Sequence, residues 1–273
     1  MKQFKILNSI FGWVSFTIAA IVYLSTLEPT VSFWDCGEFI ATAFKLQVNH
    51  PPGNSFFELI GHFFTMFAGN NLQKVPVAMN VMSSLASSFT ILLLFWSITH
   101  MARKIIIKNN EYSFGATIAI IGSGLVGALA FTFSDSFWFS AVEGIVWSSS
   151  SMFTALVFWS ILKWEEHADE KHANRWLIFI AYIVGLSIGV HLLNLLAIPA
   201  IVFIYYFKKY PYSRKGVISV AILSIVLIGT VMFGVVRGLI YGAAYMDLMF
   251  VNGFGLPFFS GVIFYIVAII IML

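Results

Sequence analysis

The sequence predicts an all-α fold, a polytopic bundle of about seven to eight transmembrane helices. Of its 273 residues, 60% are hydrophobic and only 10% are charged, whereas soluble domains carry about 45–50% apolar and about 25% charged residues. Apolar runs of about 20 residues, the length that a helix needs to cross a bilayer, recur along the chain, and the mean hydropathy is +0.92. This composition excludes a cytosolic enzyme, a disordered tail and a fibrous repeat. A net charge of +3 is no nucleic-acid signature, so we expect the lipid bilayer and no nucleic acid as a partner.

The predicted spans follow one another from the N-terminus. The apolar run 6–27 is long for a signal peptide and is followed by Pro29 without a small-x-small cleavage site, so we interpret it as a retained first span. The pair 176–188 and 191–207 is either two helices or one long kinked helix. The amphipathic stretch 54–68 is too short to span, and we expect it at the membrane interface. The other spans are predicted at 75–101, 114–133, 137–164, 217–236 and 256–273.

The distribution of basic residues predicts the orientation of the bundle. If the spans alternate and residues 176–207 count as two, twelve of the fifteen Lys and Arg residues fall on one side. Only Lys45, Lys74 and Arg237 fall on the other side. By the positive-inside rule the N-terminus is cytoplasmic. Residues 28–74 then form the first outer loop, with short juxtamembrane helices, on the periplasmic, lumenal or exterior side.

Two acids of this loop are the first candidate site residues. Asp35 and Glu38 lie among bulky aromatics in the segment FWDCGEF, residues 33–39. If the segment is helical, the i, i+3 spacing places both carboxylates on one face. Desolvation by the aromatics would favour a carboxylate that accepts a proton near neutral pH. The plain alternative is that Asp35 only caps a short helix. The single cysteine, Cys36, excludes an intrachain disulfide and a multi-cysteine metal site.

His50 lies in the segment NHPPG, residues 49–53. Two prolines and a glycine fix a turn that cannot be helical. Such a turn can hold the imidazole in a fixed orientation beside the acidic segment. The alternative explanation is a simple stop between two helices.

Three polar residues of later spans complete the candidate set. Glu143 lies about two turns inside the span 137–164, where an ionisable group is costly and indicates a functional site unless it is structural or snorkels. His191 and Asn194 form an i, i+3 pair near the outer end of their span, and interhelical hydrogen bonding is the favoured role of Asn194. The predicted topology places Glu143 and His191 at the same membrane surface as the first outer loop. We therefore expect one site there.

Two other patterns have structural explanations. Gly122, Gly124 and Gly127 are small residues that permit close helix packing. The inner loop 163–175 is rich in acids and histidines, and we interpret it as a solvated, charge-mixed connector rather than a metal site.

Four segments together resemble a known family. They are TLEPTVSFWDCGEFI (26–40), NHPPG (49–53), SAVE (140–143) and GLSIGVHLLNLL (185–196). They are similar to a bacterial membrane family related to the protein O-mannosyltransferases, which are GT-C glycosyltransferases. The resemblance implies that residues 1–273 are a GT-C-like transmembrane domain, and we expect it to be an N-terminal portion because it stops within an apolar run.

The resemblance also implies a function. Such enzymes move a sugar, here expected to be mannose, from a polyprenyl-phosphate donor to Ser or Thr hydroxyls of exported acceptor proteins, with inversion, on the outer membrane face. An essential acid lies in their first outer loop. In eukaryotic relatives two acids are adjacent, whereas here they are spaced as Asp35 and Glu38, so the resemblance leaves open which is the base. His50, Glu143, His191 and Asn194 are the expected substrate-binding residues. The expected location is a bacterial inner membrane with the site facing the periplasm.

Metal dependence and a different function class stay open. The chemistry needs no redox cofactor, and the carboxylates suit Mg²⁺ or Mn²⁺ without demanding either ion. The alternative function is a transporter with Glu143 and His191 as a relay, which predicts polar groups near mid-membrane and an internal repeat. The candidate residues instead gather at one predicted surface, and no repeat is evident. A non-catalytic scaffold would leave the segments FWDCGEF and NHPPG unexplained.

Overall fold

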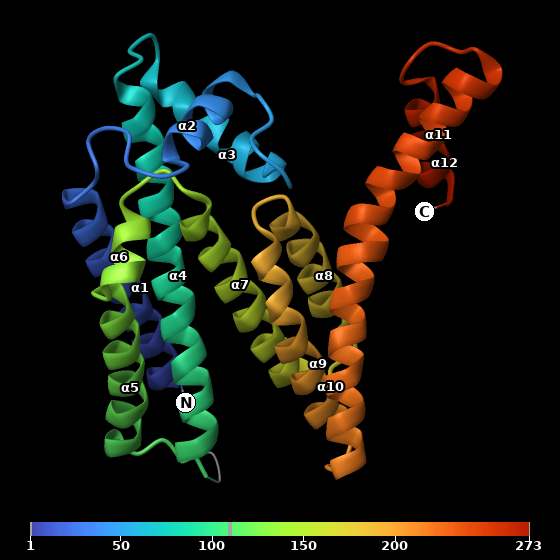
Figure 1. Cartoon of the computed structure of the whole chain (residues 1–273). Helices are drawn as coiled ribbons and strands as arrows, with labels where there is room; N and C mark the ends of the chain where they lie inside the picture. Colours follow the sequence, from blue (N-terminus) through green and yellow to red (C-terminus); the bar gives the residue numbers. More distant parts are fainter. Residues whose placement is uncertain (1, 109–110, 273) are drawn as a thin grey trace. The chain divides into compact units, whose positions relative to one another are not determined.

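The structure of the chain is a computed structural model, which describes residues 2–108 and 111–272. Every regular element in these two ranges is a helix (Figure 1), which confirms the predicted all-α bundle. The elements are α1 (Lys2–Ser25), α2 (Cys36–Lys45), α3 (Ser55–Thr65), η1 (Met66–Ala68), α4 (Lys74–Ile106), α5 (Phe114–Thr132), α6 (Asp135–Ala141), α7 (Val146–His167), α8 (Asn174–Ile188), η2 (Leu192–Leu196), α9 (Ala197–Lys209), α10 (Arg214–Gly229), η3 (Thr230–Arg237), α11 (Gly238–Phe254) and α12 (Ser260–Met272). They form two compact units, Met1–Lys208 and Lys209–Leu273.

The first unit is built around α4, which packs against α1, α5 and α7 (Figure 1). Small residues allow the close approach of α5. A Cβ atom at Gly124 would lie 2.5 Å from Thr99 Cγ2, and one at Gly127 would lie 2.6 Å from Ile98 Cδ1. These two glycines therefore have the packing role that the sequence predicts.

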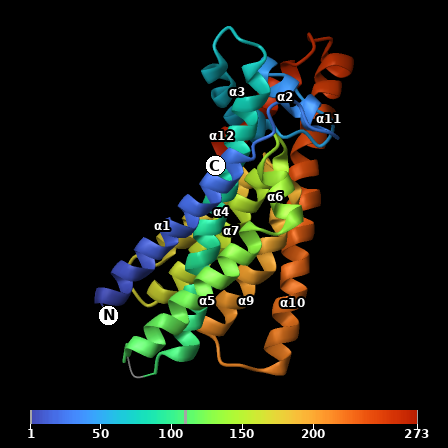
Figure 2. The same cartoon turned by 90° about the vertical axis from the view of Figure 1, so that its left-hand side faces the viewer.

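The helices α2 and α3 lie at the end of the unit where α1 ends and α4 begins (Figure 2). The helix α3 and the following η1 are the short amphipathic element expected at 54–68. The buried face of α3 includes Phe57, Glu58 and Gly61. A Cβ atom at Gly61 would lie 2.9 Å from the Cβ atom of Ala43 on α2 and equally close to Met79 on α4, so the three helices are in close contact.

The predicted span 137–164 is not one continuous helix. It is divided into α6 and α7, which meet at an angle of 110°. The break lies where the chain passes close to α2 and α4, because a Cβ atom at Gly144 would lie 3.1 Å from Asn80 Oδ1 and 3.2 Å from Ile40 Cγ1. Glu143 is therefore in the break, and the prediction that it lies two turns inside a continuous helix was wrong.

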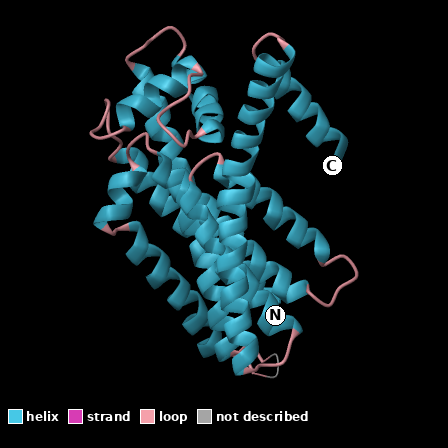
Figure 3. Ribbon diagram, turned by 45° about the vertical axis from the view of Figure 1, so that its right-hand side comes forward, coloured by secondary structure: helices cyan, strands magenta, loops and turns pink. Residues whose placement is uncertain are grey.

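The number of spans depends on how short helices are counted. Five helical stretches of the described residues are long and apolar enough to cross a membrane, and the bent pair α6–α7 makes six. The shorter helices α8 and α12, of 15 and 13 residues, would bring the count to eight, within the predicted range of about seven to eight. Figure 3 shows loops between these helices and no strand in the described residues.

Residues 176–207 form two helices rather than one kinked helix. The turn at Gly189 and Val190 separates α8 from η2 and α9. Lys208 Nζ at the end of α9 lies 3.0 Å from Asp169 Oδ2, just before α8 begins. The chain thus returns to the end of the unit from which α8 started, which agrees with the alternation on which the predicted topology rests.

The second unit is a long helical stretch followed by a hairpin. The helix α10 continues through the π-helical η3 into α11, and α12 packs back against α11. Asp247 on α11 accepts hydrogen bonds from the backbone N–H groups of Phe259 (3.2 Å) and Gly261 (3.1 Å), so its carboxylate caps the start of α12.

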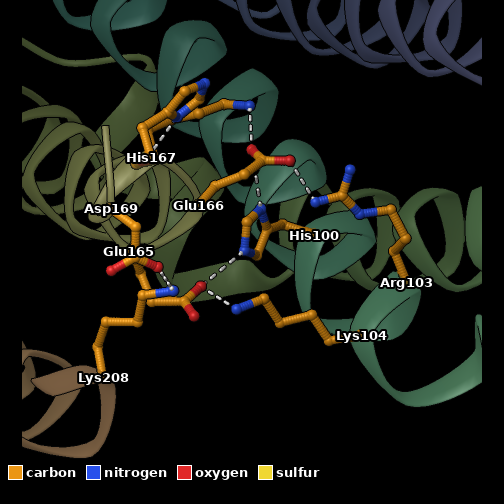
Figure 4. A network of polar contacts seen from close by, with 9 residues as sticks. His100, Arg103, Lys104, Glu165, Glu166, His167, Asp169 and Lys208 are labelled. Atoms are coloured by element: carbon orange, nitrogen blue, oxygen red, sulfur yellow. Dashed lines mark hydrogen bonds and ion pairs between the residues drawn. The ribbon is translucent and has the colours of Figure 1, made fainter. Parts of the chain in front are cut away.

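The segment 163–175 differs from the solvated connector expected there. Its first residues are the last turn of α7, and Glu165 and Glu166 face α4 (Figure 4). Glu166 Oε1 accepts a hydrogen bond of 2.5 Å from Arg103, and Glu165 pairs with Lys104. This part of the segment therefore holds the ends of α4 and α7 together.

Candidate functional site

Asp35 has an exposed carboxylate at the start of α2. It occupies the N-cap position of α2, yet its side chain makes no capping hydrogen bond. Among the described residues, no hydrogen bond or ion pair engages this carboxylate. The preceding Trp34 has φ 58° and is 87% exposed. The alternative that Asp35 serves only as a cap is not supported, because the capping bond is missing.

Glu38, in contrast, is fully engaged by His50. Glu38 Oε2 lies 2.9 Å from His50 Nδ1, and Glu38 Oε1 accepts a hydrogen bond of 2.6 Å from the backbone N–H of His50. These hydrogen bonds hold the pKa of Glu38 below its usual range, and the side-chain hydrogen bond to Glu38 raises the pKa of His50. The expected upward shift by aromatic desolvation was wrong for Glu38, because the carboxylate is exposed and paired.

The turn after α2 places the His50 ring. The backbone N–H of Gly53 donates to His50 O at 2.9 Å, and Gly53 has φ 80°, which glycine adopts without strain. The His50 ring packs against Phe39 with centroids 5.6 Å apart. The prediction that this turn holds the imidazole beside the acidic segment is confirmed by these contacts.

Glu58 is a site residue that the sequence reasoning missed. Its side chain on α3 is only 4% exposed. Glu58 Oε1 accepts hydrogen bonds of 2.8 Å from Thr42 Oγ1 and from Asn49 Nδ2, whereas Oε2 has no partner among the described residues. Burial raises its pKa to about 7. The sequence did carry a signal, because Glu58 shares its helix face with the small residues Gly61 and Thr65.

Glu143 meets the start of α2 from the α6–α7 break. It is 3% exposed and lies beside Ser32 and Cys36, the residue that follows Asp35. Two further contacts hold these segments: Glu28 N–H donates to Val142 O at 3.1 Å, and Asn80 Nδ2 donates to Glu28 O at 2.7 Å. The structure therefore brings Glu143 into the neighbourhood of the first-loop acids.

Asn194 has an interhelical structural role. Its Oδ1 accepts hydrogen bonds of 2.7 Å from Ser150 Oγ and Thr154 Oγ1 of α7, and its Nδ2 donates to Ser187 O at 3.3 Å. These bonds occupy both ends of the buried amide. They agree with the favoured structural interpretation.

His191 lies at the same end of the unit but apart from Asp35. Its Nδ1 accepts a hydrogen bond of 3.1 Å from Leu193 N–H, and its ring packs on Trp147 with centroids 4.6 Å apart. The turn before it is docked on α3, because Asn54 Nδ2 donates to Val190 O at 2.8 Å. Among the described residues, His191 makes no hydrogen bond or ion pair with the first-loop acids.

The family of the chain follows from a comparison with known proteins. Residues 35–214, about two thirds of the chain, match the family model described as "Protein O-mannosyl-transferase TMEM260 N-terminal domain". The chain belongs to this family. The matched range contains all six site residues predicted from the sequence, and it confirms the relation to the protein O-mannosyltransferases.

Two curated relatives of the TMEM260 family carry the same name, protein O-mannosyl-transferase TMEM260. The protein from Dictyostelium discoideum is 30% identical over 142 residues, which are 52% of this chain and 15% of the relative. The protein from Mus musculus is 25% identical over 174 residues, 63% of this chain and 22% of the relative. The chain thus spans less than a quarter of the length of these relatives. No solved structure matches it.

A metal site is not evident in the described part of this TMEM260-type domain. There, no three or more His, Cys, Asp or Glu side chains come together in a group that could hold an ion. Glu38 is already paired with His50, and Asp35 projects alone.

Proposed function

We propose that this chain is the site-bearing N-terminal part of a membrane protein O-mannosyltransferase. It would move mannose from a polyprenyl-phosphate donor to Ser or Thr hydroxyls of exported proteins. The α2–α3 end would face the non-cytoplasmic side, the periplasm in a bacterial inner membrane, and the N-terminus the cytoplasm. The observation that carries the proposal is the exposed, unengaged carboxylate of Asp35 in a loop whose other acids, Glu28, Glu38 and Glu58, all accept hydrogen bonds. Family membership and the names of the two relatives support it.

Asp35 would act as the general base of an inverting, GT-C-type transfer. It takes the proton from the acceptor hydroxyl as that oxygen attacks the anomeric carbon, and the bond from this carbon to the lipid phosphate breaks. General-base assistance of this kind contributes about 10²–10⁴-fold. Glu38 is less suited, because its two oxygens accept bonds from His50 and its pKa is lowered. These contacts support Asp35 rather than Glu38 as the proposed base.

His50 would stabilise the departing phosphate. Its Nδ1 is bound to Glu38, which raises the pKa of the ring and favours the protonated form. The protonated ring can then donate a hydrogen bond from Nε2 to a phosphate oxygen, and such donors stabilise developing negative charge. Glu38 acts in this scheme as the positioning residue for His50.

The later spans would support the site in different ways. Glu143 contacts Ser32 and Cys36, so it positions the start of α2 and with it Asp35. His191, on the ring of Trp147, is the proposed contact for the acceptor or donor at the edge of the site. A transporter relay through Glu143 and His191 is not favoured, because no hydrogen bond joins them in the described residues and Glu143 lies in a helix break.

The test compares wild type with Asp35→Asn in the full-length protein in membranes. The assay measures transfer of labelled mannose from a polyprenyl-phosphate donor to endogenous acceptor proteins. We expect the variant to lose about 10²–10⁴-fold in rate. Asp135→Asn is the matched control, because Asp135 is an exposed acid near the same end of the unit at the start of α6. Equal transfer by wild type and Asp35→Asn would contradict the proposed base.

A further inference from the structure

A cavity lies at the end of the first unit opposite α2 and α3. Its volume is about 330 Å³, which is near the lower limit for small-molecule sites. It is enclosed by the start of α1, the last turns of α4 and the last turns of α7. Three basic side chains, Lys5, Arg103 and Lys163, line it, one from each of these helices.

The charges that line this cavity do not balance. Among the described residues, Glu166 is the only acid that lines it. It accepts a hydrogen bond of 2.5 Å from Arg103 (Figure 4) and one of 3.1 Å from Lys163. Lys5 has no ion-pair partner among the described residues. Three cations thus face one carboxylate. If the histidines are left out of the count, the cavity has an excess of two positive charges.

The nearby acid Glu165 does not remove this excess. It is not a lining residue of the cavity, and its carboxylate pairs with Lys104. His100 Nε2 lies 3.8 Å from Glu165, and His100 Nδ1 lies 3.9 Å from Glu166 (Figure 4). Glu165 is therefore paired with Lys104 rather than with a cation that lines the cavity.

Two indole rings form the apolar wall of the cavity. The rings of Trp96 and Trp159 are 5.9 Å apart, and Lys163 Nζ lies 5.9 Å from the centroid of Trp159. Trp96 Nε1 donates to Asn8 O at 3.3 Å, which ties α4 to α1. Tryptophan and basic residues at helix ends are typical of the headgroup level of a bilayer, and basic pockets between transmembrane helices bind anionic headgroups.

We propose that this cavity binds the phosphate group of an anionic phospholipid from the membrane leaflet at the N-terminal end of α1. Lys5 and Lys163 would contact the phosphate oxygens, and the two indole rings would border the glycerol part. A phospholipid headgroup and a soluble phosphate both carry the phosphate anion that this cavity would bind. The position at the helix ends favours a lipid as its source. This site is separate from the carboxylate site and does not depend on the proposed function.

The test is native mass spectrometry of the full-length protein in detergent, titrated with phosphatidylglycerol and separately with phosphatidylcholine. We expect a preference for phosphatidylglycerol, reduced about fivefold for each lysine removed in Lys5→Ala/Lys163→Ala. Lys2→Ala/Lys108→Ala is the matched control, because these lysines have the same charge at the same end but do not line the cavity. Lys5→Arg/Lys163→Arg keeps the charges and should retain binding.

Three results would overturn the proposal. The first is an equal loss of binding in both double alanine variants, and the second is equal affinity for the two lipids. The third is complete displacement of the bound lipid by inorganic phosphate in excess, which would assign the cavity to a soluble phosphate. If Lys5→Ala/Lys163→Ala fails to fold, the second and third results still test the proposal on the wild-type protein, and loss of binding in the charge-retaining Lys5→Arg/Lys163→Arg variant would count against it.

Discussion

Three carboxyl groups of the loop between α1 and α4 lie in three different environments. Asp35 is exposed and unengaged, Glu38 is paired with His50, and Glu58 is buried between α2 and α3. Burial disfavours the charged form of a carboxyl group, whereas hydrogen bonds to the charged form favour it. The same side-chain chemistry is thus available as a base, as an orienting group and as a proton-binding structural group within one loop.

Glu58 should make the stability of the first unit depend on pH. Its pKa is raised by burial from 4.5 to about 7, so the folded state binds a proton more tightly than the unfolded state. The stabilisation that this proton provides is fully present below the pKa of Glu58 in the unfolded state. It is lost as the pH rises through about 7, the pKa in the folded state. In Glu58→Gln this loss disappears. The unfolding temperature of Glu58→Gln relative to wild type should therefore rise from pH 5 to pH 8. The rise corresponds to a difference in the free energy of unfolding of about 1–3 kcal/mol.

The measurement is thermal unfolding of the detergent-solubilised protein across this pH range, with Asp135→Asn as the control for loss of an exposed acid. A constant offset between Glu58→Gln and wild type at all pH values would contradict the assignment. The sequence shows only that Glu58 shares a helix face with small residues, whereas its burial results from the packing of α3 on α2. The residues Asp35, Glu38 and His50 were accessible to sequence reasoning because they lie in short, distinctive segments.

At the scale of the elements, the apolar runs predict where helices lie but not where they break. The predicted spans of the first unit recur as helices, since a run of apolar residues of this length has few other stable states in a membrane. The break between α6 and α7 was missed, because it depends on the close approach of Gly144 to Asn80 and Ile40, residues far away in the sequence. Whether 176–207 is one helix or two was left open for the same reason.

The contact of α5 with α4 gives a matched pair of substitutions. Gly124 and Gly122 lie on the same helix. A Cβ atom at Gly124 would lie 2.5 Å from Thr99 Cγ2, whereas a Cβ atom at Gly122 would have no other atom within 4 Å. Gly124→Ala should therefore overpack the contact and destabilise the protein by about 1–3 kcal/mol. Gly122→Ala should be neutral or stabilising by up to about 1 kcal/mol, since alanine is the better helix former.

Thermal unfolding and the yield of monodisperse protein in detergent measure both effects. Equal unfolding temperatures for the two variants would show that α5 does not pack on α4 through Gly124.

The sequence alone predicts that these glycines serve packing. It does not tell which of them faces α4, because the direction of a helix face depends on the neighbouring helices.

On the scale of the whole first unit, α4 connects two polar regions. Its 33 residues span about 50 Å, enough to cross a bilayer. Near its start Asn80 holds the loop before α2, and near its end Arg103 and Lys104 bind the last turn of α7. The proposed carboxylate site and the proposed phosphate cavity therefore lie at opposite ends of the same helices, where each can meet a different leaflet.

This arrangement predicts opposite labelling at the two ends of the unit. In a Cys36→Ala background, Val48→Cys places a thiol at a position that is 87% exposed in the loop after α2, and Lys108→Cys places one just beyond the end of α4. Because basic residues concentrate at the N-terminal end, that end should stay cytoplasmic. A membrane-impermeant maleimide should label Val48→Cys in intact cells and Lys108→Cys only after permeabilisation. Labelling of both in intact cells, or the reverse pattern, would contradict the orientation and with it the outer location of Asp35.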